Sequence, residues 1–164
     1  MPNVFEPEFD QRSSEREGFA YRATQVGLHA GSERLGASVY ELGPGNSMFP
    51  YHYHLANEEL LVVLHGRPHL RTPEGSRQLE EGEVVSFPLG KRGAHQLVNR
   101  TDSDVRLLMV SEMRSPEISV YPDSGKVGVR EYAPGSGRDG LRLNFRTVDD
   151  RDLWDGEPGP EDQG

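Results

Sequence analysis

Apolar residues in the middle of the chain occur in short runs that are separated by turn-forming residues. The strongest runs are typical of β-strands and cover residues 37–42, 59–65, 67–72, 83–88, 94–99 and 104–111. Turn sequences such as Gly43-Pro44 and Thr101-Asp102-Ser103 lie between them. Strands this short, at near-regular spacing and without helical segments between them, predict an antiparallel barrel or sandwich.

The remaining segments are expected to flank this barrel. Weaker strand patterns occur at 24–28, 117–121, 126–132 and 141–148. Beyond about Asp149 the chain is rich in Asp, Glu, Gly and Pro, a composition typical of flexible segments. The predicted organisation is an N-terminal arm over 1–35, a barrel over 36–113, a C-terminal extension that packs on the barrel or on a partner over 114–148, and a flexible tail over 149–164.

Composition narrows the class of protein without naming a function. Only 34% of the 164 residues are hydrophobic, and 19 glycines and 12 prolines favour short strands and turns over long helices. A formal net charge of −9 disfavours nucleic acid or an anionic membrane as a partner. The absence of cysteine excludes a disulfide framework and a zinc-thiolate site. The longest apolar run, residues 60–64, is too short for a membrane span, and we expect a cytoplasmic protein.

Three histidines and one glutamate have the spacing of a metal site in a small β-barrel. His52 and His54 are two residues apart, so on an extended strand their side chains project from the same face. Glu59 follows a short turn-like stretch at the head of the next strand, and His95 lies in a later predicted strand. Glu58 is the alternative carboxylate, because strand alternation lets only one of the two neighbours face inward. Imidazole and carboxylate together bind first-row divalent metals.

The same alternation predicts an apolar pocket around these side chains. The residues that share a face with them are Met48, Pro50, Leu61, Val63 and Leu97. A ring of apolar side chains around a few polar groups is the usual composition of a small-ligand site. This pocket is therefore the predicted place for a substrate or ligand.

At these residues the sequence resembles the cupin superfamily. The first cupin motif is a glycine, then His-x-His, a glutamate five residues after the second His, and a further glycine; its matches are His52, His54, Glu59 and Gly66. The second motif runs from a glycine through Pro-x-Gly to a histidine and an asparagine; its matches are Gly82, Pro88, Gly90, His95 and Asn99. The glycines that precede the histidines, Gly45 and Gly90, lie further from them than is usual, which leaves the ligand set intact.

The resemblance implies both a fold and a cofactor. The implied fold is all-β, a double-stranded β-helix, or jelly-roll barrel, with N- and C-terminal extensions. In the family, the residues that match His52, His54, Glu59 and His95 bind one metal ion, commonly iron, manganese, nickel, zinc or copper. The segment Tyr-Pro-Asp-Ser-Gly-Lys at 121–126 is further similar to a group of small single-domain bacterial cupins. Small cupins with such arms resemble homodimers, so a homodimer is expected.

Two functions from different classes are compatible with this sequence. The first is a mononuclear metalloenzyme, of the dioxygenase type or the isomerase or lyase type, that acts on a small organic molecule. The second is a ligand-binding or sensory cupin without turnover. Lys91 and Arg92, in the loop before His95, could contact an anionic substrate at the pocket rim, or could belong to a solvated loop.

Overall fold

The computed structural model describes residues 1–13, 16–152 and 155. Nearly all regular structure in these residues is β-strand, and the figures label the elements as follows. The strands are β1 (Gln11–Ser13), β2 (Tyr21–Thr24), β3 (Leu35–Leu42), β4 (Tyr53–His54), β5 (Glu59–His65), β6 (His69–Thr72), β7 (Gly75–Gln78), β8 (Val84–Phe87), β9 (Gln96–Val98), β10 (Val105–Glu112), β11 (Glu117–Tyr121), β12 (Lys126–Arg130) and β13 (Arg142–Arg146). The helices are α1 (Val26–His29) and the 3-10 turns η1 (Lys91–Gly93), η2 (Pro122–Ser124) and η3 (Thr147–Asp149).

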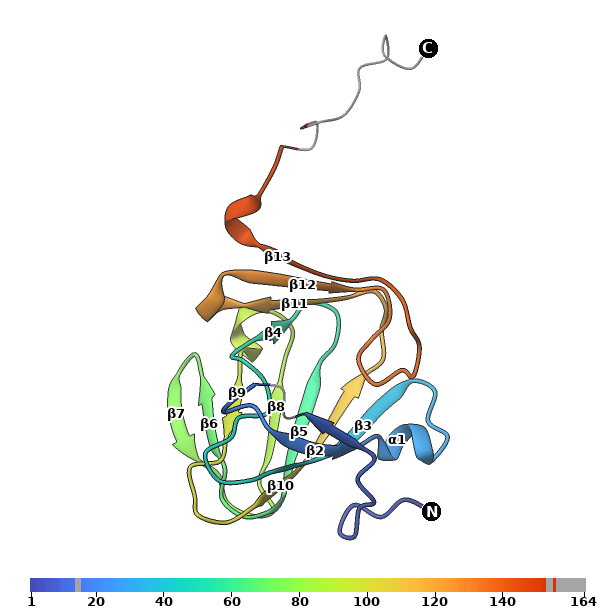
Figure 1. Cartoon of the computed structure of the whole chain (residues 1–164), viewed down its shortest axis with the longest axis vertical. Helices are drawn as coiled ribbons and strands as arrows, with labels where there is room; N and C mark the ends of the chain where they lie inside the picture. The colour runs from blue at the N-terminus through green and yellow to red at the C-terminus, as the bar shows by residue number, and fades with distance from the viewer. Residues whose placement is uncertain (14–15, 153–154, 156–164) are drawn as a thin grey trace.

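The strands form three antiparallel sheets that build the barrel. The largest has the order β1-β2-β3-β10-β5-β8, the second has the order β13-β12-β11-β4, and the third has the order β7-β6-β9. Figure 1 shows the β11–β13 layer lying across one end of the barrel. Sequence-distant neighbours, such as β3 beside β10 and β10 beside β5, give the strand order of a jelly roll. The predicted all-β jelly-roll fold is confirmed.

Alternating burial along the central strands places the hydrophobic core inside the barrel. On β10, Val105 and Leu107 are fully buried, and Leu61 and Val63 on the adjacent β5 are 0% and 1% exposed. The intervening residues face outward, as the strand period of two requires. Each fully buried leucine contributes about 2 kcal/mol of transfer free energy, so this interior holds the sheets together. Leu42, Leu97 and Met48 extend the same cluster toward the strand ends.

Both flanking segments join the sheets of the barrel. β2 pairs with β3, where Arg22 lies opposite Glu41, and β1 adds the outermost strand. The strand expected over 24–28 is wrong: β2 ends at Thr24, and α1 begins at Val26. α1 packs on β3, where a Cβ on Gly27 would lie 2.8 Å from the Ala37 nitrogen, so only glycine lets the helix approach this closely. The tail expected over 149–164 lies largely outside the described residues.

The C-terminal extension is the segment that positions the functional site. β11 pairs with β12 on one side and with β4 on the other, so that Ser119 lies opposite His54. β13 completes this sheet at its outer edge and exposes Leu143 and Phe145 at 40% and 50%. Among the described residues, no helix has the length and apolar character needed to cross a membrane.

Candidate metal centre

Three strand ends bring the candidate ligands together. His52 and His95 form an isolated antiparallel bridge, in which each backbone N–H donates to the other's carbonyl, at 3.1 Å and 2.8 Å. His54 lies on β4 and Glu59 is the first residue of β5. The short 55–58 connection turns the chain back between them, so side chains that are five residues apart in sequence meet inside the barrel. Glu58 is exposed on the other face, as alternation demands.

The donor atoms converge on one point. His52, His54 and Glu59 each offer a ligand atom, and these three atoms lie within 4.8 Å of one another. The Glu59 carboxylate oxygen Oε2 is 3.2 Å from His54 Nε2 and 3.4 Å from His95 Nε2. His52 and His95 are 6% and 1% exposed. Nitrogen and carboxylate donors at these separations are those that a first-row divalent cation takes.

Backbone carbonyls fix the orientation of two of the histidine rings. His52 Nδ1 lies 2.8 Å from the Pro50 carbonyl oxygen, and His95 Nδ1 lies 2.9 Å from that of Gly93. A carbonyl oxygen only accepts, so Nδ1 donates in both rings and Nε2 is left with a lone pair. The Phe87 ring stacks on His95 at a centroid distance of 3.8 Å and fixes its plane. Both Nε2 atoms are therefore prepared as metal donors.

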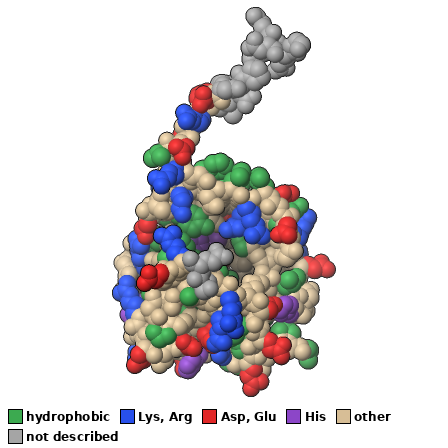
Figure 2. All heavy atoms as spheres, viewed as in Figure 1, with side chains coloured by type: hydrophobic (Ala, Val, Ile, Leu, Met, Phe, Trp, Pro, Cys, Tyr) green, Lys and Arg blue, Asp and Glu red, His purple; other side chains and the backbone are tan. Residues whose placement is uncertain are grey.

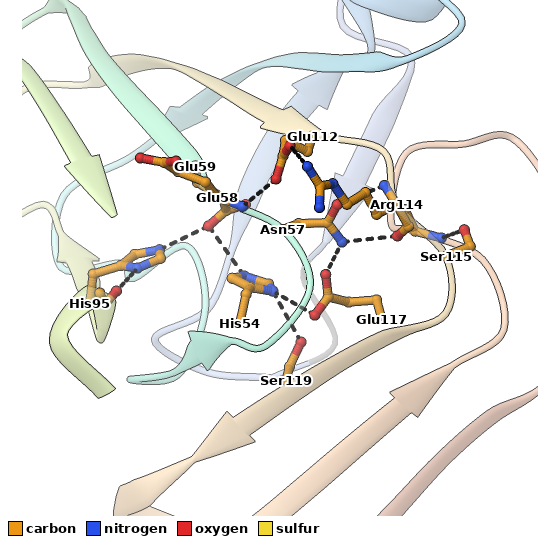
Figure 3. A network of polar contacts seen from close by, with 12 residues as sticks. His54, Asn57, Glu58, Glu59, His95, Glu112, Arg114, Ser115, Glu117 and Ser119 are labelled. Atoms are coloured by element: carbon orange, nitrogen blue, oxygen red, sulfur yellow. Dashed lines mark hydrogen bonds and ion pairs between the residues drawn. The ribbon is translucent and has the colours of Figure 1, made fainter. Parts of the chain in front are cut away.

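His54 is oriented by a buried carboxylate instead. Its Nδ1 lies 3.5 Å from Glu117 Oε1 and 3.4 Å from the Ser119 hydroxyl. Glu117 is fully buried, and its other oxygen accepts from the side-chain amide of Asn57 (Figure 3). Asn57 is itself fixed by the backbone of Arg114, which donates to Asn57 Oδ1 at 2.7 Å and accepts from Nδ2 at 3.0 Å. A carboxylate behind a histidine ligand is the usual second partner of such a ring.

Buried polar atoms without a hydrogen-bond partner test whether the site suits a metal. Among the described residues such atoms are His54 Nε2, His95 Nε2, Glu59 Oε2, Glu117 Oε1 and His69 Nδ1. Three of these five face one another at the point where the candidate ligands meet. Leaving three buried polar atoms unsatisfied is costly, and a bound cation would satisfy all of them together. The residues therefore fit a divalent metal ion.

The electrostatics of the four side chains differ according to their neighbours. Burial, with His95 and His54 nearby, lowers the pKa of His52 to about 3, and burial also lowers the pKa of His95. Burial alone would raise the pKa of Glu59, but the histidines outweigh it and hold the pKa at about 2. Burial alone would lower the pKa of His54, but Glu117 and Glu59 outweigh it and raise the pKa to about 10. Without a metal, the site thus holds two neutral imidazoles and a protonated His54 beside an anionic carboxylate. Neutral imidazole is the form that binds metals, so a bound cation would replace the proton on His54 Nε2.

A cavity of about 390 Å³ opens onto this cluster. All four candidate ligands line it, together with Met48, which the sequence had also placed there. The other four predicted pocket residues lie elsewhere: Leu61, Val63 and Leu97 belong to the hydrophobic core, and Pro50 is exposed. Figure 2 shows histidine atoms inside this hollow and cationic side chains around it.

Strand alternation predicted inward-facing residues but not how far along the barrel each one lies. Core and cavity residues share the inner face, and only position along the axis separates them. Lys91 and Arg92 are exposed on η1 and are not among the cavity-lining residues. The cations that do line the cavity are Arg130 and Arg138.

The sequence analysis did not predict several residues of the site. Glu117, Ser119 and Tyr121 alternate along β11 and face the cluster, and Asn57 supports Glu117 from the connection before β5. The 117–121 segment was predicted as a strand, and a glutamate on its inner face was the available signal. The missing information was the pairing of β11 with β4, which places Glu117 next to a histidine more than sixty residues away in the chain.

The fold and the site together define a jelly-roll barrel with a candidate metal centre near one end. Residues 38–111 match the family described as Cupin domain, so this barrel segment is a cupin domain. No curated protein matches the sequence of this chain.

Solved structures agree on the fold. A sugar phosphate isomerase of the cupin superfamily from Silicibacter pomeroyi is 23% identical, with a TM-score of 0.76 over 94% of this chain and 98% of that one. A candidate sugar phosphate isomerase from Acidithiobacillus ferrooxidans is 22% identical, with a TM-score of 0.74 over 87% of each chain. The polyketide cyclase RemF from Streptomyces resistomycificus is 23% identical, with a TM-score of 0.53 over 65% of this chain and 77% of that one. The names of these proteins differ in activity, so the shared barrel does not select a reaction.

Proposed function

We propose that this protein is a mononuclear metal-binding cupin that acts as a metalloenzyme on a small organic molecule. The proposed ligands are His52, His54, Glu59 and His95. The observation that carries the proposal is the set of buried, unpartnered donor atoms His54 Nε2, His95 Nε2 and Glu59 Oε2 beside a cavity of about 390 Å³. A purely structural site would not need a cavity of ligand size next to it.

The side chains have separate roles in this proposal. A bound divalent metal would act as a Lewis acid that polarises an oxygen of the substrate. His52 and His95 present neutral Nε2 atoms, because the carbonyls of Pro50 and Gly93 hold their Nδ1 protons. Glu59 supplies the anionic donor, and its charge offsets part of the positive charge of the cation.

The described part of the cavity lining offers few side chains that could act as a general acid or base. Among the described lining residues, Glu59 and the exposed Glu33 are the carboxylates, and Glu59 is a proposed ligand. Tyr40 also lines the cavity, but burial raises its pKa well above the ordinary value of a tyrosine, which disfavours it as a base. We therefore propose that the metal carries the chemistry, as an isomerase, lyase or dioxygenase. The name of the Silicibacter relative makes sugar phosphate isomerisation one reaction to assay.

The scarcity of acid and base groups also favours a second candidate function. A ligand-binding or sensory cupin would hold a small molecule at the same cavity and release it unchanged. Such a protein needs no proton-transfer group. Incubation of the metal-loaded protein with a ligand that it binds, followed by product analysis, separates this function from the enzyme.

Metal content is the measurement that tests the proposal. Tag-free protein purified without added metal is expected to hold about one divalent transition metal per chain by mass spectrometry. A His52→Ala/His95→Ala variant is expected to lose it. His65→Ala is the matched control, because His65 is exposed and pairs with Glu81 at 2.7 Å, away from the cluster. Wild-type protein that loads no divalent ion, or a double variant that keeps the metal, would refute the metal centre.

A homodimer and a cytoplasmic location stay predictions of the sequence. The exposed apolar face of β13, with Leu143 and Phe145, supports the dimer, since an edge strand with apolar side chains is prone to pair. Light scattering on the full chain measures the oligomeric state.

A further inference from the structure

One half-buried cation at the cavity is left without an acceptor. Three arginines of the described chain are half-buried: Arg71, Arg106 and Arg130. Arg71 forms a two-point pair with Asp123 at 2.6 Å and 2.9 Å, and Arg106 binds Glu41 at 2.8 Å. Arg130 has no hydrogen bond or ion pair with any described residue, and it lines the cavity. A partly desolvated guanidinium without a partner is a ready binding site for an anion.

The sheet register places Arg130 beside the metal cluster. Arg130 lies directly opposite Glu117 in the β11–β12 pair, so both side chains project from the same face of the sheet. Two residues further along β11, on the same face, Ser119 lies opposite His54. Arg130 and His54 lie on the two strands that flank β11, so their backbones are two strand spacings of roughly 5 Å apart across the sheet and roughly 7 Å apart along it. The long arginine side chain can cover part of this separation, and a small molecule in the cavity can cover the rest.

The cross-strand neighbour of Arg130 is turned toward the histidines instead of toward the arginine. Cross-strand neighbours of opposite charge normally pair, which would join Arg130 to Glu117. One Glu117 oxygen, however, accepts from Asn57, and the other faces His54 Nδ1 at 3.5 Å. Glu117 therefore interacts with Asn57 and His54, and the guanidinium of Arg130 remains free to bind an anion in the cavity.

The charged residues that line the cavity are of both signs. Arg138 lines the mouth, where its guanidinium carbon lies 3.8 Å from the centroid of the Tyr132 ring. Of the two carboxylates that line the cavity, Glu33 is exposed and Glu59 faces the histidine cluster. Arg138 also lies close enough to the Glu131 carboxylate to interact with it electrostatically. Arg130 is therefore the lining guanidinium that has no charged partner among the described residues.

We propose that the cavity takes a small organic anion whose carboxylate or phosphate group binds Arg130, with Arg138 assisting at the mouth. The opposite end of the molecule would carry the oxygen that reaches the histidine cluster. The placement of that oxygen at the histidine cluster rests on the proposed function. It does not need the metal for the anion contact itself, because a guanidinium binds carboxylate or phosphate directly through paired N–H donors.

The test is a titration with inorganic phosphate and, separately, with malonate at constant ionic strength. Binding is followed by NMR on the full chain through the Arg130 Nε–H signal, which is assigned from its absence in Arg130→Gln. Wild-type protein is expected to bind one of the two anions, with the Arg130 signal shifted. Arg130→Gln is expected to bind roughly 10- to 100-fold more weakly, the range for loss of a charge-assisted hydrogen-bond pair. The anion that binds more tightly identifies the charged group of the substrate.

Two further variants make the result specific to Arg130. Arg130→Lys keeps the charge but loses the two-point geometry, and intermediate binding is expected. Arg100→Gln removes an exposed arginine outside the cavity lining, and unchanged binding is expected. Equal weakening in Arg130→Gln and Arg100→Gln would mean unspecific charge attraction and overturn the proposal. So would an unshifted Arg130 signal with both anions.

Metal content measured on the same samples separates this inference from the proposed function. Anion binding that depends on Arg130 in protein unable to load metal would support the anion site and refute the metalloenzyme. Protein that loads one metal per chain but binds neither anion would keep the metal centre and overturn the anion site.

Discussion

Replacing Glu117 with glutamine is expected to weaken metal binding without unfolding the protein. Glutamine has nearly the same shape, but one carboxylate oxygen becomes an NH₂ group that only donates. Asn57 cannot adapt to this change, because its oxygen and its nitrogen are both fixed by the Arg114 backbone. Its NH₂ therefore keeps donating to position 117, so the glutamine oxygen must face Asn57 and the glutamine NH₂ must face His54.

The new NH₂ reverses the preferred tautomer of His54. Metal binding requires neutral His54, and in that form Nδ1, which lies 3.5 Å from Glu117 Oε1, would have to accept a hydrogen bond, so the single ring proton would move to Nε2. Nε2 is the atom that faces Glu59 Oε2 at 3.2 Å and is the proposed metal donor. Loss of such an outer partner typically costs 10- to 100-fold in metal affinity, which is roughly 1.4–2.8 kcal/mol.

A chelator competition titration with zinc measures this effect. Nitrogen NMR of the His54 ring reports the tautomer directly, which a general loss of stability would not change. Glu112→Gln is the matched control, because Glu112 pairs with Arg114 at 2.7 Å in the same network without contacting a histidine. The reasoning is wrong if folded Glu117→Gln binds zinc as tightly as wild type, or if Glu112→Gln loses as much affinity.

Three further predictions concern stability, each measured by chemical denaturation. Burial alone would raise the pKa of Glu41, but Arg106 and Arg22 outweigh it and lower the pKa. The stability that ionised Glu41 contributes is therefore complete above about pH 4.5 and is lost as the pH falls further. Glu41→Gln should be less stable than wild type at pH 7, and the difference in unfolding free energy should narrow in acid. A difference that does not change with pH would contradict this. Leu107→Ala removes a fully buried side chain and should cost about 2–5 kcal/mol, whereas a loss under 1 kcal/mol would show that the barrel collapses around the site. Gly93→Ala would place a Cβ 1.8 Å from the Pro88 oxygen, so a loss of about 1–3 kcal/mol is expected, and an unchanged midpoint would refute the close approach.

Local pattern was sufficient for the barrel because its strands alternate cleanly. The inner residues of β5 and β10, such as Leu61 and Leu107, are apolar, so the strand period was visible in the sequence. β7 (Gly75–Gln78) was missed because all four of its residues are exposed, which removes the alternation that marks a strand. The prediction of a strand over 24–28 was wrong although its apolar residues fit a strand pattern. The chain there forms α1, which packs against β3.

The candidate ligands were predictable because strand alternation and the cupin spacing both mark them in the sequence. Alternation placed His52 and His54 on one face, and the cupin spacing selected Glu59 and indicated His95. The structure brings His52, His54 and Glu59 together. Glu117 and Arg130 belong to a hairpin that reaches the site through pairing with β4, and no local signal encodes that pairing. For the same reason the sequence considered Lys91 and Arg92 as rim cations, while the cavity is lined by arginines from the far end of the chain.

The pairing of β11 with β4 divides the centre between two separable parts of the chain. The barrel segment carries the candidate ligands, while the β11–β12 hairpin carries the groups behind and beside them, Glu117, Ser119, Tyr121 and Arg130. A truncated chain that ends before β11 would keep every candidate ligand yet lose the wall of the cavity. Conversely, exchange of residues 117–130 between related barrels is a direct route to altered ligand preference with the metal ligands untouched, which makes this hairpin the natural unit for redesign.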